Sequence, residues 1–282
     1  MTISGHATVA GVMGWPVAHS LSPRVHNYWI RRYGLDGIYI PMPVAPDDVE
    51  EALRALPKLG LAGCNVTVPH KEAALACVDQ ASDVASRIGA VNTILVGSDG
   101  TLIGTNTDAD GFRDNVSANV PGWTAADGPA VVLGAGGAAR AVIAALVDDG
   151  SPEVRVINRT RSRADQLAED IGGPVFAHAW DDAANALDGA ALVINTTTLG
   201  MTGEAPLVLD LAPLPLSAVV ADIVYTPLRT ALLEQAAERG NPVVEGLGML
   251  LHQAKPGFAT WFGVEPEVTN ELEAFVREAL RG

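Results

Sequence analysis

The strongest indication of the fold is the segment Val131-Val132-Leu133-Gly134-Ala135-Gly136-Gly137-Ala138-Ala139-Arg140. Three apolar residues typical of a buried strand end at a glycine turn, and an alanine-rich stretch typical of a helix follows. The first glycine permits the tight turn, and Ala139 lets the helix pack closely on the strand. Free N–H groups at the start of such a helix favour a negatively charged ligand. The segment predicts a dinucleotide-binding turn, and the alternative is a purely structural glycine turn. The predicted cofactor-binding residues of this turn are Gly134, Ala135, Gly136, Gly137 and Ala138, and Gly136 lets the backbone approach the pyrophosphate.

The next predicted strand ends without an acidic residue. An Asp or Glu at this tip would bind the 2′-hydroxyl of a ribose and repel a 2′-phosphate. The sequence instead has Asn158, Arg159 and Thr160, followed by Arg161 and Arg163. A cation and hydrogen-bond donors suit a phosphate, so NADP is the predicted cofactor. Its predicted contacts here are Asn158, Arg159, Thr160 and Arg163, and a solvated basic helix start is the alternative.

Strand-like and helix-like segments alternate on both sides of this motif. Apolar strands without a polar face are predicted at 130–133, 153–157, 191–194 and 217–223, with helices at 138–147, 163–171 and 228–239. Such strands favour a parallel sheet covered on both faces. The predicted fold class is therefore α/β, with a Rossmann-type, doubly wound NADP-binding domain at 113–247.

Residues 1–112 form a second alternating region, which we predict to be an α/β substrate-binding catalytic domain. Strands are expected at 9–14, 38–42 and 63–68, and helices at 23–33, 47–56 and 71–78. Two further strands, 94–96 and 102–103, flank a hairpin turn. A segment rich in Gly, Pro and Asp, 119–128, is the predicted linker.

The composition excludes several classes of protein. Hydrophobic residues make up 48% of the 282 residues, enough for the cores of two domains. The formal net charge of −15 repels nucleic acid and anionic lipid, so neither is an expected partner. Cys64 and Cys77 are too few for a disulfide framework and lack metal-ligand spacing, so no metal is predicted. Without a signal-peptide pattern or a membrane span, the expected location is cytoplasmic.

Three segments of the first domain hold polar residues that a purely structural role does not explain. Ser20 and Ser22 lie at a loop-to-helix transition, where their hydroxyls can face an anion. Ser22 as a simple helix cap is the alternative. In the second segment, strand alternation puts Asn65 and Thr67 on one side, and Lys71 begins the next helix. The third segment spans 106–111.

These segments read HSLSP at 19–23, NVTVPHK at 65–71 and GTNTD at 104–108. In this order, together with the glycine motif, they resemble the shikimate dehydrogenase family from about Gly11 to Gly263. The resemblance implies reversible, NADP-dependent reduction of 3-dehydroshikimate to shikimate in aromatic amino acid biosynthesis. It also implies a cleft between the two domains, with the helices of 248–282 packing back on the first.

The resemblance implies a catalytic pair, Lys71 and Asp108. A lysine near the reacting oxygen can accept and deliver a proton, and a neighbouring carboxylate can orient it. The sequence leaves open which of the two transfers the proton. For the substrate, the implied contacts are Ser20, Ser22, Thr67, Asn92, Asp108, Tyr225 and Gln253, the two serines binding its carboxylate. For the cofactor, they include Thr196, Val224, Gly246 and Met249. His19, His70 and His252 are expected to be structural.

Two other functions stay open at this point. One is an NAD-preferring quinate/shikimate dehydrogenase, against which Arg159 and the serine pair Ser20 and Ser22 argue. The other is a non-catalytic sensor of NADP or a metabolite, which would be expected to lack Lys71 or Asp108. The predicted partner is a small-molecule substrate, and the chain is expected to be a monomer or a homodimer.

Overall fold

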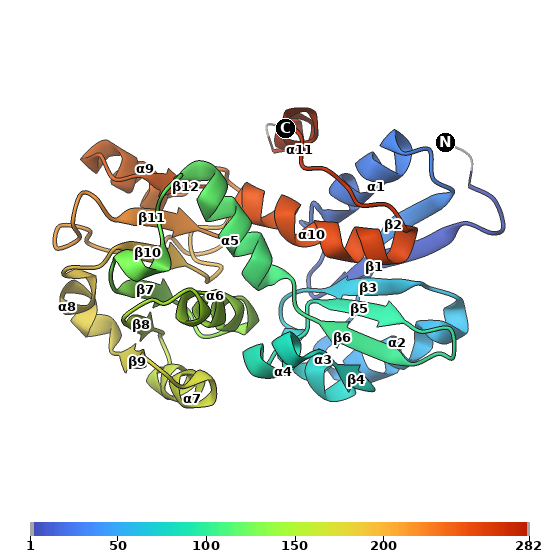
Figure 1. Ribbon diagram of the computed structural model, residues 1–282, viewed down its shortest axis with the longest axis horizontal. Coiled ribbons are helices and arrows are strands. Elements are labelled where there is room, and N and C mark those ends of the chain that lie inside the picture. The colour runs from blue at the N-terminus through green and yellow to red at the C-terminus, as the bar shows by residue number, and fades with distance from the viewer. Residues whose placement is uncertain (1–2, 281–282) are drawn as a thin grey trace. The chain divides into compact units, whose positions relative to one another are not determined.

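The computed structural model describes residues 3–280 (Figure 1). It consists of two compact units, one holding the chain up to Thr107 and again from Leu250, the other Asp108–Met249. The expected boundary followed residue 112. In the structure the second unit begins at Asp108 instead, so that helix α5 (Asp108–Asn119) belongs to it entirely. The other division falls inside helix α10 (Gly246–Phe262).

The first unit is built on a six-stranded sheet in the order β2-β1-β3-β5-β6-β4. The strands are β1 (Thr8–Gly14), β2 (Gly37–Pro43), β3 (Gly63–Val66), β4 (Gln80–Ala81), β5 (Thr93–Val96) and β6 (Leu102–Thr105). Pairing is parallel except at β5, which runs antiparallel to both neighbours, as the predicted hairpin requires. The helices are α1 (Ser22–Arg32), α2 (Val49–Ala55), α3 (Lys71–Cys77), α4 (Asp83–Ile88) and α11 (Asn270–Glu278).

The second unit has a fully parallel sheet in the order β9-β8-β7-β10-β11-β12. Its strands are β7 (Ala130–Leu133), β8 (Val154–Ile157), β9 (Val175–His178), β10 (Leu192–Asn195), β11 (Val219–Asp222) and β12 (Val243–Val244). The helices are α5, α6 (Gly137–Asp148), α7 (Arg161–Ile171), α8 (Ala183–Leu187) and α9 (Ala231–Arg239). This is the doubly wound order, with its switch point between β7 and β10, and it confirms the predicted fold class.

Each unit has its own apolar core, as the strand patterns predict. All four residues of β7 and of β10 are buried, which is the burial of strands covered on both faces. In the first unit, Leu53, Cys64 and Ile94 are fully buried together. A fully buried aliphatic side chain contributes about 1.5–3 kcal/mol, so these cores hold the strand ends in place. Among the described helices, none is long and apolar enough to cross a membrane.

An aromatic cluster in the first unit encloses a histidine. The His26 ring stacks on Tyr39 with centroids 3.9 Å apart, and the Phe258 ring from α10 lies 5.9 Å away. His26 is 0% exposed, and neither ring nitrogen has a hydrogen-bond partner among residues 3–280. Burial lowers the pKa of His26 to about 3, because the charged imidazolium cannot be solvated there.

We predict that His26→Leu makes the protein less sensitive to acid. As pH falls below about 6.5, the unfolded chain protonates this histidine and the folded chain does not. The free energy of unfolding then falls by about 1.4 kcal/mol per pH unit, or about 2 kcal/mol at pH 5. Urea midpoints at pH 7 and pH 5 measure this loss, which should be smaller in the variant. Equal losses in both proteins would contradict the buried, neutral state.

Candidate active site

Four neighbouring strands of the first unit bring their loops to one edge of the sheet. The carboxyl ends of β1, β3 and β6 lie there, together with the amino end of the antiparallel β5. Backbone hydrogen bonds join the loops: Thr67 N–H to the Met13 carbonyl at 2.9 Å, and Asn92 N–H to the Thr105 carbonyl at 3.0 Å. The three polar segments of the first domain therefore meet at this edge.

Ser20 and Ser22 follow β1 at this edge. Helix α1 begins at Ser22 itself, and its N-cap residue is Leu21, with no side-chain capping bond. The alternative role of Ser22 as a simple cap is therefore not what the structure has. The Ser20 hydroxyl oxygen accepts the Ser22 N–H at 3.3 Å, which holds the two serines in one turn. Ser22 is 5% exposed and Ser20 is half-buried.

Thr67 and Lys71 lie in the turn after β3. The strand ends at Val66, two residues earlier than the expected end. Lys71 is half-buried and is the first residue of α3. His70 is buried and its Nε2 lies 2.8 Å from the Val44 carbonyl oxygen, a structural contact, whereas His19 is exposed.

Asn92 sits at the centre of a buried hydrogen-bond network. Its Oδ1 accepts the Thr107 N–H and the Thr93 hydroxyl, both at 2.9 Å. Its Nδ2 donates to the Thr107 hydroxyl oxygen at 3.0 Å and lies 3.5 Å from Oε1 of Gln253. The Thr107 hydroxyl donates to the Gln253 carbonyl at 2.8 Å. The structure thus brings Asn92 and Gln253, two predicted substrate contacts, together.

The network continues into residues that were not predicted as site residues. Asn65 Nδ2 donates to the Thr93 hydroxyl oxygen at 3.0 Å, and the Tyr39 hydroxyl donates to Asn65 Oδ1 at 2.6 Å. Burial raises the pKa of Tyr39 well above its usual value, so this hydroxyl keeps its proton as a donor. Strand alternation had singled out Asn65, but nothing in the sequence paired it with Tyr39.

Asp108, the second member of the predicted catalytic pair, is the first residue of α5. It follows Thr107 directly and is buried, with 4% of its surface exposed. Lys71 belongs to the first unit and Asp108 to the second.

The glycine turn in the second unit leads directly into helix α6 and leaves space beside the start of that helix. Gly134 has a φ of +114°, and a Cβ there would lie 2.7 Å from the Thr196 hydroxyl oxygen. Gly136 caps α6 without any side-chain bond, and no atom lies within 4 Å of a Cβ placed on it. The N–H groups of a twelve-residue helix therefore open onto free space beside Gly136. Ala135 is buried, and Gly137 and Ala138 are half-buried.

Three arginines follow β8, namely Arg159, Arg161 and Arg163, and they differ in the contacts that their side chains make. Arg161 Nε donates to Asp165 Oδ1 at 2.8 Å, and Arg163 Nη2 lies 3.4 Å from the Ala135 carbonyl of the glycine turn. Arg159 is exposed, and across residues 3–280 no hydrogen bond or ion pair engages its side chain. Asn158 Nδ2 donates to the Thr160 carbonyl at 2.9 Å and shapes the turn. The three arginines thus differ in that Arg159 alone has no such contact within residues 3–280.

The remaining predicted cofactor residues follow β10 and β11 or open α10. The Thr196 hydroxyl donates to the Leu133 carbonyl at 2.7 Å, which ties it to the glycine turn at the switch point. Val224 is buried and Tyr225 half-buried, both just beyond β11. A Cβ on Gly246 would lie 2.5 Å from the Ile223 carbonyl oxygen, so only glycine fits there. Met249 is buried, with 7% exposed.

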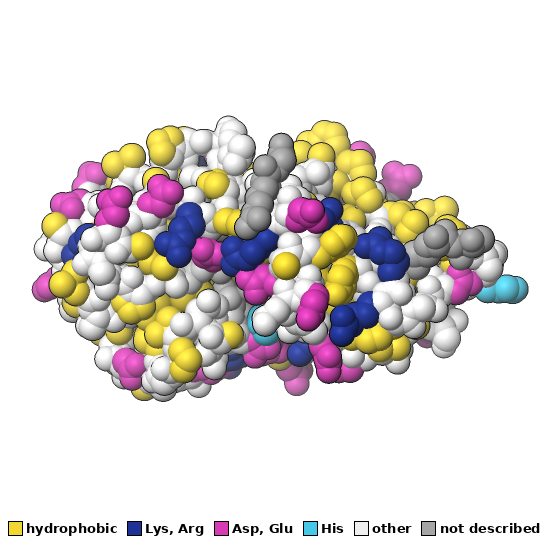
Figure 2. Space-filling view, turned by 90° about the horizontal axis from the view of Figure 1, so that it is seen from above, with side chains coloured by type: hydrophobic (Ala, Val, Ile, Leu, Met, Phe, Trp, Pro, Cys, Tyr) yellow, Lys and Arg dark blue, Asp and Glu magenta, His cyan; other side chains and the backbone are white. Residues whose placement is uncertain are grey.

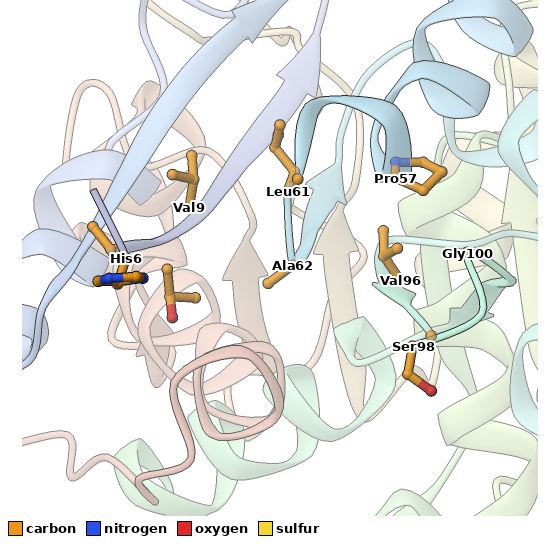
Figure 3. Close-up of a pocket in the computed structure, with 12 residues that line it drawn as sticks. His6, Val9, Pro57, Leu61, Ala62, Val96, Ser98 and Gly100 are labelled. Atoms are coloured by element: carbon orange, nitrogen blue, oxygen red, sulfur yellow. The ribbon is translucent and has the colours of Figure 1, made fainter. Parts of the chain in front are cut away.

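A pocket in the first unit lies away from all these residues (Figure 3). Its lining includes His6, Val9, Leu61 and Ala62, at the amino ends of β1 and β3, and Ser98 beyond β5. This is the edge of the sheet opposite Ser20 and Lys71. Among the described lining residues, His6 is the one titratable side chain, so these residues include no group suited to catalysis.

The described residues form neither a cluster of metal ligands nor, on the face shown in Figure 2, a continuous basic surface for a polyanion. No group of three or more His, Cys, Asp or Glu side chains within residues 3–280 is placed to hold a metal ion. On the face drawn in Figure 2, the Lys and Arg side chains lie scattered among Asp and Glu side chains, without a continuous basic patch. The cations at the β8 tip are therefore a local feature on an acidic protein.

Comparisons with known proteins find related sequences for both parts of the chain. A family model described as the shikimate dehydrogenase substrate binding domain matches residues 12–94, and one described as shikimate / quinate 5-dehydrogenase matches 119–201. The shikimate dehydrogenase (NADP(+)) of Paramagnetospirillum magneticum is 58% identical, over 97% of this chain and 99% of its own.

Two solved structures are similar over almost their whole length. The shikimate 5-dehydrogenase of Thermus thermophilus, in complex with NADP(H) and shikimate, is 39% identical with a TM-score of 0.83, covering 97% of this chain and 98% of its own. The quinate dehydrogenase of Corynebacterium glutamicum, in complex with NAD, is 29% identical with a TM-score of 0.86, covering 98% of this chain and 99% of its own.

The glycine turn generates a matched pair of variants. Gly136→Ala fits the protein itself but would intrude on a pyrophosphate, so it should weaken NADPH binding by about tenfold and leave the melting temperature unchanged. Gly134→Ala forces a left-handed backbone and a contact with Thr196, so it should also lower the melting temperature by several degrees, the effect of about 1–2 kcal/mol. Fluorescence titration measures the NADPH affinity of each variant, and thermal melting measures its melting temperature. Normal NADPH affinity in Gly136→Ala would exclude the pyrophosphate from this turn.

Proposed function

The chain belongs to the shikimate dehydrogenase family, and we infer from this that it catalyses the reversible, NADP-dependent reduction of 3-dehydroshikimate to shikimate. This step belongs to aromatic amino acid biosynthesis. The observation that carries the proposal is the meeting of Ser20, Ser22, Thr67, Lys71 and Asn92 at one edge of the first sheet. Hydroxyls, an amide and an ammonium are what a small polyhydroxy acid needs for recognition.

The two ends of the substrate meet different chemistry in this proposal. Ser20 and Ser22 bind the carboxylate, with the Ser22 hydroxyl free of any capping role. Thr67, Asn92, Asp108 and Gln253 are assigned to the ring hydroxyls, and Tyr225 is a further proposed contact with the substrate. The buried network around Asn92 supports this, because a fixed amide selects hydroxyl positions better than a mobile one.

Lys71 and Asp108 handle the proton. Reduction of a ketone makes an alkoxide, which must receive a proton, and oxidation of the alcohol releases one. The Lys71 ammonium can deliver that proton and its amine can take it back, while the Asp108 carboxylate orients it. A hydrogen bond fixes the backbone of Lys71 at the start of α3, since the Lys71 carbonyl accepts the Val91 N–H at 2.9 Å.

The second unit fits NADP. The open start of α6 and the glycine turn suit the pyrophosphate, and Arg159 with Asn158, Thr160 and Arg163 suits the 2′-phosphate. Thr196, Val224, Gly246 and Met249 would lie along the rest of the cofactor. When bound, NADPH supplies the hydride for the reduction.

We further propose that the enzyme works in the cytoplasm as a monomer or a homodimer. Cys64 and Cys77 are both unpaired thiols, which is the usual state of cysteines in a reducing compartment. Burial raises the pKa of the Cys64 thiol to about 12, which makes it unreactive.

NADPH formation with shikimate and quinate, each tested with NADP and NAD, measures the function directly. We expect strong turnover with shikimate and NADP only. Turnover with quinate and NAD would indicate a broader specificity, like that suggested by the quinate dehydrogenase of Corynebacterium glutamicum in complex with NAD. No turnover in any combination would favour a sensor that binds without catalysis.

Lys71→Ala should lower kcat by about two to four orders of magnitude, the usual contribution of a general acid–base group. NADPH affinity should stay close to normal, because Lys71 lies outside the nucleotide-binding unit. Lys58→Ala, an exposed lysine, is the matched control and should behave as wild type. Full turnover in Lys71→Ala, or lost NADPH binding, would remove Lys71 from the assigned role.

Arg159→Ala should reduce the preference for NADP over NAD by about tenfold or more, because it removes a charge-assisted contact with the 2′-phosphate. Arg161→Ala is the control, since Arg161 is held by Asp165 and should leave the preference unchanged. The ratio of the two kcat/KM values measures it. An unchanged ratio in Arg159→Ala would place the 2′-phosphate elsewhere.

A further inference from the structure

A buried carboxylate lies between the loops that follow β10 and β11. Asp222, the last residue of β11, is 2% exposed. Its Oδ1 accepts the Val224 N–H at 2.9 Å and Asn195 Nδ2 at 3.0 Å. Its Oδ2 accepts the Thr230 hydroxyl at 2.7 Å. Burial raises the pKa of this carboxyl to about 6, and the three hydrogen bonds partly oppose that shift.

Asn195 extends the contact into the loop after β10. It is 0% exposed and uses every polar atom of its side chain. Besides Asp222, its Nδ2 donates to the Leu199 carbonyl at 3.0 Å. Its Oδ1 accepts both the N–H of Thr197 at 3.0 Å and the hydroxyl of that residue at 2.7 Å. The amide therefore sets the shape of the segment that begins with Thr196.

Backbone contacts join the two loops as well. The Ile223 N–H donates to the Asn195 carbonyl at 3.0 Å, and the Thr202 N–H donates to the Thr226 carbonyl at 2.8 Å. The Thr230 hydroxyl oxygen also accepts the Leu233 N–H and caps α9. Asp222 bonds directly to Val224 in the loop after β11 and to Thr230 at this cap, and it reaches the loop after β10 through Asn195, so its carboxylate couples all three.

We propose that Asp222 is a positioning residue for the nicotinamide half of the cofactor. It holds the loops that carry Thr196, Val224 and Tyr225 in one arrangement, and acts through them because it is itself buried. The proposal rests on the proposed function, which assigns these three residues to the ligands. No other small side chain accepts three donors at once, since an asparagine in this place would offer a single oxygen.

Four variants separate positioning from general stability. Asp222→Ala removes all three bonds, and Asp222→Asn keeps the shape and loses one acceptor. Thr230→Val removes one of the three bonds to Asp222, together with the Thr230 cap of α9. Asn241→Ala is the matched control: Asn241 is 5% exposed and donates to the Pro215 and Ala218 carbonyls, before the opposite end of β11. It removes comparable buried bonds far from the loops.

Calorimetric measurement of the binding of two ligands distinguishes a positioning role from a general effect on stability. NADPH reaches both ends of the proposed site, whereas adenosine 2′,5′-bisphosphate carries the 2′-phosphate without the nicotinamide. We expect Asp222→Ala to weaken NADPH binding by about tenfold and to leave the bisphosphate within about twofold. kcat should fall as well. Asp222→Asn should retain most of the NADPH affinity and most of kcat. Asn241→Ala should lower the melting temperature without changing the affinity for either ligand.

Two results would overturn the proposal. One is that Asp222→Ala weakens the binding of NADPH and of the bisphosphate equally. The other is that Asn241→Ala also weakens NADPH binding selectively. Each result would indicate that Asp222 has a purely structural role. Should Asp222→Ala not fold, Thr230→Val takes its place, with a smaller loss for NADPH alone expected and no loss contradicting the proposal. Failure of the wild type to oxidise shikimate overturns the proposed function only, since neither binding measurement involves shikimate.

Discussion

Strands that pair in parallel send the loops after them to the same edge of a sheet, because each crossover returns the chain to the opposite edge. Both units of this protein depend on that constraint. In the first unit, the one antiparallel strand, β5, contributes its amino end to the same edge, so Asn92 arrives just before it. In the second unit the order reverses between β7 and β10, which leaves the glycine turn and Thr196 beside each other.

Loops gathered at one edge contain polar groups that the sheet cannot satisfy, and an unpaired buried polar group costs about 1–3 kcal/mol. The two units solve this in the same way. A buried amide, Asn92 in one and Asn195 in the other, accepts and donates across neighbouring loops. The bonds that satisfy these groups also fix the loops, so the stability of each edge and the geometry of its site arise from the same contacts.

The features predicted correctly from the sequence are those with a strong local signal. The apolar strands, the glycine turn and the hairpin between β5 and β6 are set by neighbours in the chain. Helix α5 was not predicted, because buried Asp108, Gly111 and Asn115 interrupt its apolar pattern. The short edge strand β9 has only one buried residue, Val175, and so lacks a clear apolar signal. The partners Tyr39, Asn65 and Thr93 are distant in sequence, and only the folded sheet brings them together.

The acidic character of the chain shapes how its ligands are selected. With a net charge of −15, the protein as a whole repels NADP and a carboxylate substrate, and such a field acts over about 10 Å at moderate ionic strength. Hydroxyls and helix N–H groups act only at contact distance. In the proposed site, the substrate carboxylate meets the neutral Ser20 and Ser22, whereas the 2′-phosphate meets the exposed Arg159. Recognition therefore depends on the fit at the edge of each sheet, which explains why so many buried bonds are used to hold those edges rigid.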